Sequence, residues 1–160
     1  MSSPVATFSF PTPTLFGPGT LGELPARMAR LGLKRPLVVT DAGLVETDAF
    51  RALGHMLGEE NRNRRWFLYS GVHPNPIESD VREPAALFQE KHCDGVIAIG
   101  GGSALDAGKA TRLLAKRPGF DFAKFYDEPD WSGLAPFIAI PTTAGTGSEV
   151  GRSSVITLDG

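Results

Sequence analysis

The sequence has a single cysteine, Cys93, among its 160 residues, so no disulfide can form within the chain. A chain without disulfides suits a reducing compartment. The N-terminus lacks a basic segment followed by an apolar run, the pattern of a secretory signal peptide. No apolar run reaches the length that a membrane span needs. These absences predict a cytoplasmic protein with no membrane partner.

The chain also lacks a strong charge of one sign and a cluster of metal ligands. Its 16 Lys and Arg residues and 18 Asp and Glu residues give a formal net charge of −2, which does not favour a nucleic-acid partner. The three histidines, His55, His73 and His92, do not have the spacing of metal ligands. Surface or packing roles are expected for them, and no metal site is predicted in these 160 residues.

Short apolar segments alternate with helical patterns along most of the chain. Residues 6–10 and 14–16 flank two prolines and predict a small hairpin or edge ribbon. Strands that alternate with helices imply right-handed crossovers and a parallel sheet. The predicted fold class is therefore α/β, with helices flanking a parallel sheet and a short N-terminal β ribbon. The expected strands are 37–40, 66–69, 96–99 and 137–140, and the expected helices are 21–31, 46–58, 79–92 and 103–116, with Pro84 tolerable only in the first turn of its helix.

Polar or glycine-rich residues follow each of the four main predicted strands. In a parallel sheet, ligands bind outside the carboxyl ends of the strands. Asp41 follows the first of these strands and Asn75 lies beyond the second, while residues 100–103 and 141–148 follow the third and fourth. Four such strand ends at one edge favour a ligand-binding site there.

The run GVIAIGGGSALDAGKA, residues 95–110, is the most informative segment. A glycine turn between a strand and a helix lets a phosphate approach backbone N–H groups at the positive end of the helix dipole. The dinucleotide pattern G-x-G-x-x-G fails at Leu105, and the Walker pattern fails because Ala110 replaces its hydroxyl residue. A phosphate-bearing ligand is the leading hypothesis. The alternative is a tight turn closed by a capping box of Ser103 and Asp106.

Four motifs resemble the iron-containing (group III) alcohol dehydrogenases: VTDAGL at 39–44, HPNPIESDV at 73–81, IGGGSALDAGKA at 99–110 and IPTTAGTGSEV at 140–150. The resemblance implies an N-terminal Rossmann-like domain that binds NAD(P) and a C-terminal helical domain. That second domain carries an aspartate and three histidines for iron or zinc, and hydride passes between the nicotinamide and an alcohol or aldehyde carbon. By this resemblance, residues 1–160 are the dinucleotide-binding domain and the metal-binding half lies beyond Gly160. No catalytic residue is then expected in this chain, which alone is predicted to be inactive.

The resemblance also implies roles for single residues. Asp41 would bind the adenosine ribose, and its carboxylate would repel a 2′-phosphate, which favours NAD over NADP. A helix cap or turn is the alternative for Asp41, and an Asx turn is the alternative for Asn75. Asp106 would meet a ribose hydroxyl or serve as a cap, and Lys109 would neutralise phosphate or face solvent. The remaining expected cofactor contacts are the pyrophosphate cradle Gly101, Gly102 and Ser103 and the second loop Thr142, Thr143, Thr146, Gly147 and Ser148.

One departure from the family pattern stands near the second loop. The family often has threonine after the Glu-Val pair, where this chain has Gly151, so one hydroxyl contact to the cofactor is expected to be missing. A different class of function is a stand-alone nucleotide-binding module without catalysis, and an ATP-dependent P-loop protein is a weaker third possibility. A small alcohol or aldehyde substrate belongs only to the enzymatic hypothesis. A homo-oligomer is compatible with each of them.

Overall fold

A four-stranded parallel sheet forms the centre of the computed structural model, which describes residues 6–8, 12–58, 65–122, 124 and 131–158. The strand order is β4-β3-β5-β6, and every neighbouring pair is parallel. This order places β5 in the interior, and all six of its residues are buried. The strands are β3 (Pro36–Val39), β4 (Phe67–Tyr69), β5 (Gly95–Gly100) and β6 (Phe137–Pro141).

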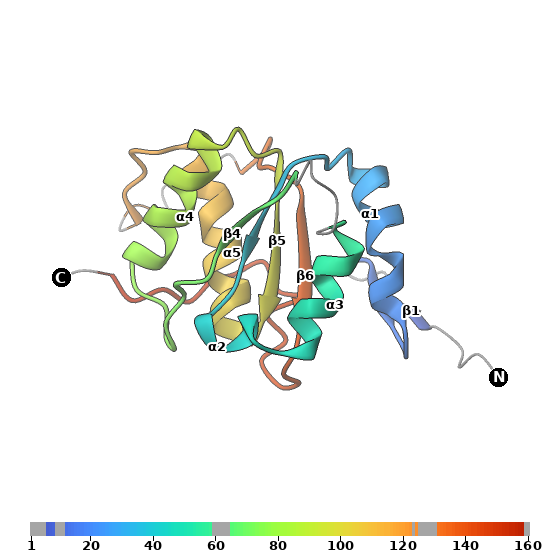
Figure 1. The fold of residues 1–160 in the computed structure, drawn as a ribbon. Coiled ribbons are helices and arrows are strands. Elements are labelled where there is room, and N and C mark those ends of the chain that lie inside the picture. Colours follow the sequence, from blue (N-terminus) through green and yellow to red (C-terminus); the bar gives the residue numbers. More distant parts are fainter. Residues whose placement is uncertain (1–5, 9–11, 59–64, 123, 125–130, 159–160) are drawn as a thin grey trace.

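Helices cover both faces of the sheet, as Figure 1 shows. On one face, α1 (Leu24–Leu31) and α3 (Asp48–Met56) contribute buried residues to a cluster that includes Val38 and Ile97 of the sheet. On the other face, α4 (Ser79–Glu90) and α5 (Gly102–Lys116) pack against each other. The predicted α/β fold with a parallel sheet and flanking helices is confirmed.

Three short elements complete the described structure. A short 3₁₀ helix, Thr20–Glu23, leads into α1. A two-stranded antiparallel ribbon joins β1 (Ala6–Phe8) to β2 (Thr14–Phe16), where the sequence predicted one, although residues 9 and 10 of the expected first strand lie outside the described residues. The one-turn helix α2 (Ala42–Val45) follows β3 directly.

Gly108 allows α5 to lie close to the sheet. A Cβ atom at Gly108 would lie 2.7 Å from the Cβ atom of Ala98 and 3.2 Å from the ring of Phe137. Real Cβ atoms do not approach so closely, so a larger residue would push the helix away from β5 and β6. Because Gly108 has no side chain, α5 can pack at a short distance from β5 and β6.

Two helices differ from the prediction. The helix expected over 46–58 is shorter, because Thr47 accepts a hydrogen bond from the Phe50 N–H and begins α3 as a cap. The one-turn helix α2 lies before this segment and was not predicted. Pro84 lies beyond the first turn of α4, where the sequence pattern predicted that proline would not be tolerated. The residue is buried, and Val81 and Ala85 on either side of it pack against Ala110 and Leu114 of α5.

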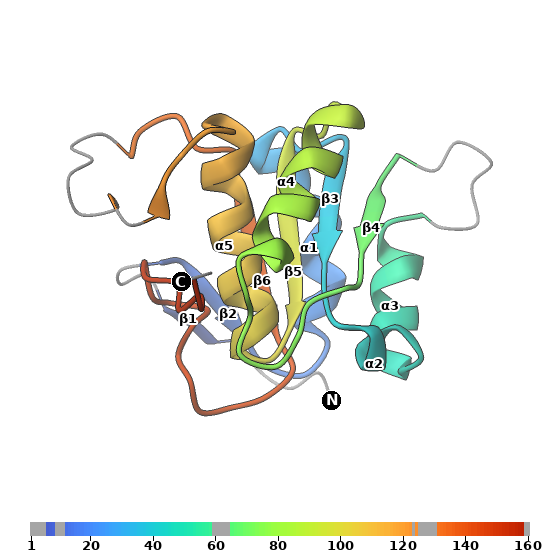
Figure 2. The same ribbon diagram turned by 90° about the vertical axis from the view of Figure 1, so that its left-hand side faces the viewer.

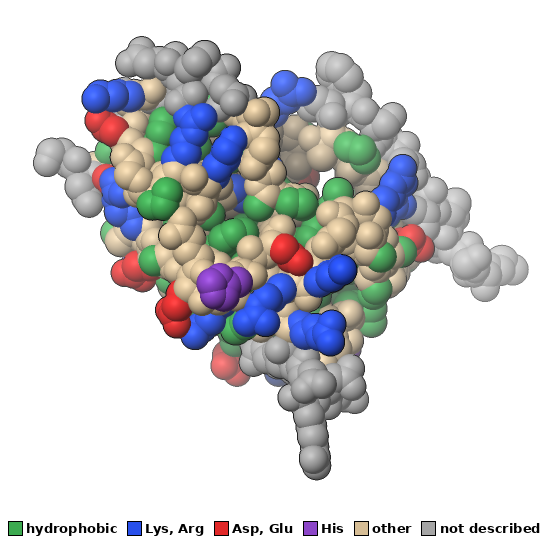
Figure 3. Space-filling model, turned by 90° about the horizontal axis from the view of Figure 1, so that it is seen from above, with side chains coloured by type: hydrophobic (Ala, Val, Ile, Leu, Met, Phe, Trp, Pro, Cys, Tyr) green, Lys and Arg blue, Asp and Glu red, His purple; other side chains and the backbone are tan. Residues whose placement is uncertain are grey.

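The two ends of the sheet have different chemistry. All four strands run downward in Figure 1, so the loops with the predicted ligand-binding residues lie at the lower, carboxyl end. Figure 3 shows the opposite, amino end, where several Lys and Arg side chains and a histidine lie on the surface. Lys34 and Arg35 precede β3 at this end, and their backbone N–H groups donate to the Asp94 carboxylate at 2.7 and 2.9 Å. Within the described part of the chain, no helix has the length and apolar character to cross a bilayer.

Candidate dinucleotide-binding site

The glycine turn after β5 forms the centre of the candidate site. Gly100 has a φ of 146°, and a Cβ atom there would lie 2.8 Å from the Cβ atom of Ala104. Gly101 is the N-cap of α5. Because glycine has no side chain, this residue cannot accept a hydrogen bond from the first N–H groups of the helix. A Cβ atom at Gly101 would meet Thr143 Oγ1 at 3.7 Å, an ordinary contact distance. The turn therefore presents backbone donors where only Thr143 Oγ1 lies within 4 Å of the Gly101 Cβ position, and a phosphate cradle requires such donors.

The second predicted loop lies against the glycine turn. The Thr142 N–H donates to the Gly100 carbonyl at 2.9 Å and so continues the pairing of β5 with β6. A Cβ atom at Gly102 would lie 2.9 Å from Thr146 Cγ2, which shows how closely the two loops approach. The hydroxyl residues Thr142, Thr143 and Thr146 are exposed. The structure thus brings residues 101–103 and 142–148 together at the carboxyl end of the sheet.

Asp41 lies at the end of β3 beside the same turn. Its Oδ1 accepts a hydrogen bond from the Leu44 N–H at 2.9 Å and caps α2. Its Oδ2 faces Gly100, 3.5 Å from the position that a Cβ atom would take there. The carboxylate therefore has both a capping oxygen and an oxygen directed toward the turn. The helix cap that was the alternative for Asp41 forms, and its second oxygen faces the glycine turn.

Asn75 joins the site from the loop between β4 and α4. It has a left-handed backbone with a φ of 55°, which asparagine tolerates better than most residues. Its N–H donates to Ser103 Oγ at 3.3 Å. The Ile77 N–H, which an Asx turn at Asn75 would use, donates to Asp80 instead. The structure therefore brings Asn75 to the first turn of α5.

Ser103 and Asp106 do not form the capping box that the sequence allowed. The Asp106 carboxylate accepts hydrogen bonds from Ser148 Oγ at 2.5 Å and from the Val155 N–H at 3.1 Å. Lys109 Nζ lies 2.8 Å from Asp106 and donates to the carbonyls of Ser148 and Ser153. Lys109 is therefore largely buried and does not face solvent. The pair connects α5 to the segment that follows β6, which runs back along this helix in Figure 2.

The iron-containing alcohol dehydrogenase family model matches residues 11–160, nearly the whole chain. This chain belongs to the iron-containing alcohol dehydrogenase family. The family membership that the four motifs predicted is confirmed.

Similar proteins extend well beyond the matched region. Alcohol dehydrogenase 4 of Schizosaccharomyces pombe is 37% identical over 156 residues, which are 96% of this chain and 36% of that protein. The 1,3-propanediol dehydrogenase of Klebsiella pneumoniae is 35% identical and is matched over 98% of this chain and 41% of its own length. The chain therefore spans about two fifths of the length of these relatives.

Solved structures show the same fold. An alcohol dehydrogenase from Oenococcus oeni has a TM-score of 0.78 and 36% identity, over 91% of this chain and 38% of its own. A sulfoacetaldehyde reductase from Bifidobacterium kashiwanohense, solved in complex with NAD+, has a TM-score of 0.70 and 26% identity, over 90% and 43% of the two chains. The α/β sheet of this chain is thus the fold of iron-containing alcohol dehydrogenases.

The histidines of this family member take no part in a group of metal ligands. Among the residues that the structure describes, no three His, Cys, Asp or Glu side chains gather as a metal site would require. His73 binds the buried Asp80 through Nδ1 at 2.8 Å, and its own side chain is 65% exposed. The described residues therefore do not fit iron or zinc, and no metal-dependent step is assigned to them.

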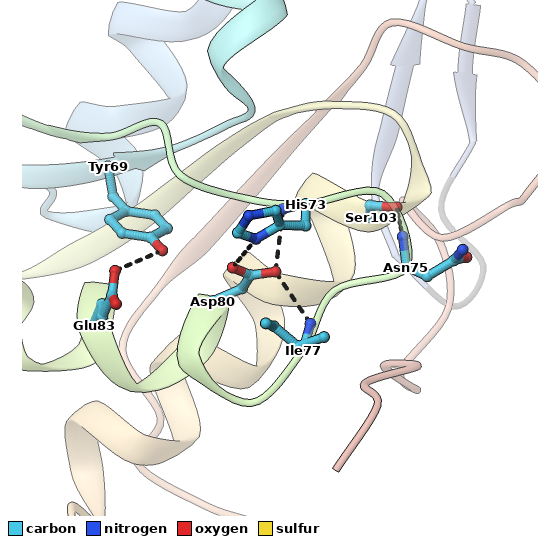
Figure 4. A network of polar contacts seen from close by, with 7 residues as sticks. All are labelled: Tyr69, His73, Asn75, Ile77, Asp80, Glu83 and Ser103. Atoms are coloured by element: carbon cyan, nitrogen blue, oxygen red, sulfur yellow. Dashed lines mark hydrogen bonds and ion pairs between the residues drawn. The ribbon is translucent and has the colours of Figure 1, made fainter. Parts of the chain in front are cut away.

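Sequence reasoning missed Asp80, which Figure 4 shows at the centre of a polar network. Its side chain is 1% exposed and accepts hydrogen bonds from the N–H groups of His73 and Ile77, both at 3.1 Å, and from the His73 ring. The sequence does offer a signal for this role. Asp80 follows a Pro-Asn-Pro loop that has few backbone N–H groups, so one carboxylate can bind most of them. Composition alone does not tell this buried aspartate from a solvated one.

The largest pKa shifts lie outside the glycine turn. Burial raises the pKa of the Cys93 thiol to about 11, so the thiol stays protonated and is a poor nucleophile. Burial and the hydrogen bond to Glu83 raise the pKa of Tyr69 above its ordinary value. Burial lowers the pKa of Arg112, which donates to the Ala135 carbonyl at 2.6 Å. These shifts reflect packing of the fold, in which Cys93 is buried.

Proposed function

We propose that this chain binds NAD at the carboxyl end of its sheet and forms the dinucleotide-binding domain, residues 1–160, of an alcohol dehydrogenase. The glycine turn at the N-terminus of α5 carries this proposal, because a Cβ atom at Gly101 would have only an ordinary contact with Thr143 Oγ1 of the hydroxyl-rich loop after β6. NAD supplies hydride chemistry, while the protein supplies binding and orientation. The substrate class is a small alcohol, or the aldehyde or ketone that its oxidation gives.

The residues divide into three groups around the proposed cofactor. Gly101, Gly102 and Ser103 would hold the pyrophosphate through backbone donors and the Ser103 hydroxyl. Asn75 would close this cradle from the neighbouring loop, since its N–H already binds Ser103 Oγ. The second loop would contact the pyrophosphate and the nicotinamide ribose through Thr142, Thr143, Thr146, Gly147 and Ser148. Asp106 would act on the cofactor through Ser148, whose hydroxyl it binds.

Asp41 would set the preference for NAD over NADP. The oxygen that faces Gly100 is placed to accept hydrogen bonds from ribose hydroxyls. A 2′-phosphate at the same position would meet a carboxylate of like charge, which costs binding free energy. NAD is therefore the expected cofactor.

Metal chemistry belongs elsewhere in this proposal. The iron or zinc site that the family implies would lie in a C-terminal helical domain, because the described residues of this chain do not gather three ligands. The chain would position the nicotinamide against that site. Its buried, protonated Cys93 also fits the proposed cytoplasmic location.

Calorimetric titration of the purified chain with NAD, NADP and ATP tests the proposal. We expect one site that binds NAD more tightly than NADP and does not bind ATP with comparable affinity. Equal affinity for ATP would instead favour a general nucleotide-binding module. No measurable binding of either dinucleotide would reject the proposal.

A further inference from the structure

The loop between β4 and α4 has few backbone donors, and a single carboxylate binds two of them. Residues 73–77 read His-Pro-Asn-Pro-Ile, so only His73, Asn75 and Ile77 carry an N–H group. The first and the last of these donate to Asp80 Oδ2, both at 3.1 Å. The middle one, Asn75, donates to Ser103 Oγ in the first turn of α5. Figure 4 shows Asp80 between the two ends of the loop and Ser103 beside Asn75.

Asp80 therefore fixes both ends of the loop. The carboxylate is 1% exposed, so water cannot easily replace it as an acceptor. Two prolines restrict the backbone between the fixed ends, and Asn75 has a left-handed conformation there. The Pro76 carbonyl accepts a further hydrogen bond from the Thr157 N–H at 2.8 Å. With its ends held, the loop has little freedom to move Asn75 away from Ser103.

We infer that Asp80 is a positioning residue for the phosphate cradle: by binding the His73 and Ile77 N–H groups, it holds Asn75 against Ser103. This inference rests on the proposed dinucleotide site, because it assigns the preorganisation of that site to a buried residue that does not touch the cofactor. Preorganisation lowers the cost of ordering a loop when a ligand binds. Asp80 therefore contributes to NAD affinity through the loop.

The two oxygens of Asp80 have separable roles. Oδ2 accepts both backbone hydrogen bonds, whereas Oδ1 accepts only from the His73 ring. Asp80→Asn can keep its amide oxygen at the Oδ2 position and place its NH₂ group against His73 Nδ1. The ring then has to accept at Nδ1 and carry its proton on Nε2. The loop should stay in place while the tautomer of His73 reverses.

The test compares four proteins by NAD titration and by backbone amide NMR spectra: the wild type, Asp80→Ala, Asp80→Asn and Glu83→Gln. Glu83 is a matched control, because it lies one turn further along α4 and binds Tyr69 OH at 3.0 Å rather than the loop. We expect Asp80→Ala to weaken NAD binding about tenfold and to shift the Asn75 and Ser103 amide signals. Asp80→Asn and Glu83→Gln should stay within about threefold of the wild type. Asp80→Asn should hold the His73 proton on Nε2, whereas Glu83→Gln should leave it on Nδ1.

Each outcome decides between the two claims. Unchanged Asn75 signals and unchanged NAD affinity in Asp80→Ala would overturn the positioning role. So would a loss in Asp80→Asn as large as in Asp80→Ala. If Asp80→Ala does not fold, Asp80→Asn decides alone: a reversed tautomer with the Asn75 signal in place supports the role, and a displaced Asn75 signal rejects it. If the wild type binds no dinucleotide, the proposed function fails, while the amide spectra still show whether Asp80 holds the loop.

Discussion

At the scale of single residues, Asp41 combines a structural and a proposed binding role in one carboxylate. Oδ1 caps α2 through the Leu44 N–H, and Oδ2 faces the glycine turn. A substitution that removes the whole side chain alters both roles at once. A substitution that keeps an oxygen acceptor but removes the charge separates them.

Asp41→Asn should relax the preference for NAD without destabilising the protein. The amide oxygen can still cap α2, but the negative charge that repels a 2′-phosphate is gone. We expect the NADP dissociation constant to fall relative to the NAD dissociation constant. The change in the difference between the two binding free energies should be roughly 1–3 kcal/mol. Asp41→Gly should relax the preference similarly and lose only a few tenths of a kcal/mol of stability with the cap, because glycine is itself tolerated at an N-cap. An unchanged ratio of the two dissociation constants in both variants, measured by calorimetry, would remove Asp41 from the ribose site.

Gly101 and Gly102 should respond differently to substitution by alanine. A Cβ atom at Gly101 has an ordinary contact in the protein, so Gly101→Ala should unfold with a free energy within about 1 kcal/mol of the wild type but bind NAD weakly. A Cβ atom at Gly102 would collide with Thr146, so Gly102→Ala should also lower the melting temperature. Thermal unfolding and NAD titration of both variants distinguish the two cases. Normal NAD binding by a folded Gly101→Ala would show that this glycine serves only the turn.

At the scale of elements, the ion pair of Asp106 and Lys109 connects α5 to the segment after β6. Lys109 also binds the Ser148 and Ser153 carbonyls, and Asp106 binds Val155 as well as Ser148. The side chains of Asp106 and Lys109 are only 14% and 10% exposed. The loop of residues 142–148 is therefore held at its C-terminal end by α5. The N-terminus of the same helix faces this loop.

Lys109→Met should loosen this segment while the sheet stays intact. Methionine keeps much of the packing volume, but Asp106 is left without its buried partner, which we expect to cost about 2–3 kcal/mol. Hydrogen exchange should accelerate at residues 148–155 and stay unchanged in β3 and β5. Protection that remains equal to wild type in residues 148–155 would show that the ion pair does not hold the segment.

The main strands and helices could be predicted from sequence because their apolar residues are contiguous or periodic. β5 is the clearest case, since its buried run GVIAIG lies between polar segments. The start of α3 at Asp48 and the unpredicted one-turn helix α2 depend on caps at Thr47 and Asp41, local hydrogen bonds that periodicity does not reveal. The same limit of local patterns applied to the site. The ends of the predicted strands indicated Asp41, Asn75 and the glycine turn. The contacts of Asp106 with Ser148 and Val155, by contrast, span 42 and 49 residues in sequence. Sequence patterns of short range cannot predict such partners.

At the scale of the whole molecule, stability should fall at alkaline pH. The Cys93 thiol has a pKa of about 11 in the folded protein against 9.0 for an ordinary cysteine thiol, so the unfolded chain loses this proton first. The stability linked to the thiol is then fully present below pH 9 and is lost as the pH rises toward 11. Tyr69, whose pKa is also raised, acts in the same direction.

Denaturant unfolding at a series of pH values measures this effect. The free energy of unfolding should decline between pH 9 and pH 11, and Cys93→Ala should have a shallower decline over the same window. Glu83→Gln serves as a second probe, because it removes a charge beside Tyr69 and should also flatten the decline. Identical slopes in the wild type and Cys93→Ala would contradict the assigned cause.

The 160-residue protein should not oxidise alcohols by itself if the proposed division of labour holds. The described residues do not gather three metal ligands, so added iron or zinc should not restore activity. Absorbance of NADH, followed with a series of small alcohols, measures turnover. Alcohol-dependent NADH formation by the purified protein would refute the assignment of metal chemistry to a second domain.

The central claim is that NAD binds at the carboxyl end of the sheet, and amide chemical-shift mapping during an NAD titration tests it most directly. We predict saturable shifts at Asn75, at residues 101–103 and at residues 142–148, with no shifts around Lys34 and Arg35 at the amino end. Gly101→Ala should abolish the shifts at residues 142–148 at the same NAD concentration. Saturable shifts confined to the amino end, or none at any NAD concentration, would contradict the account.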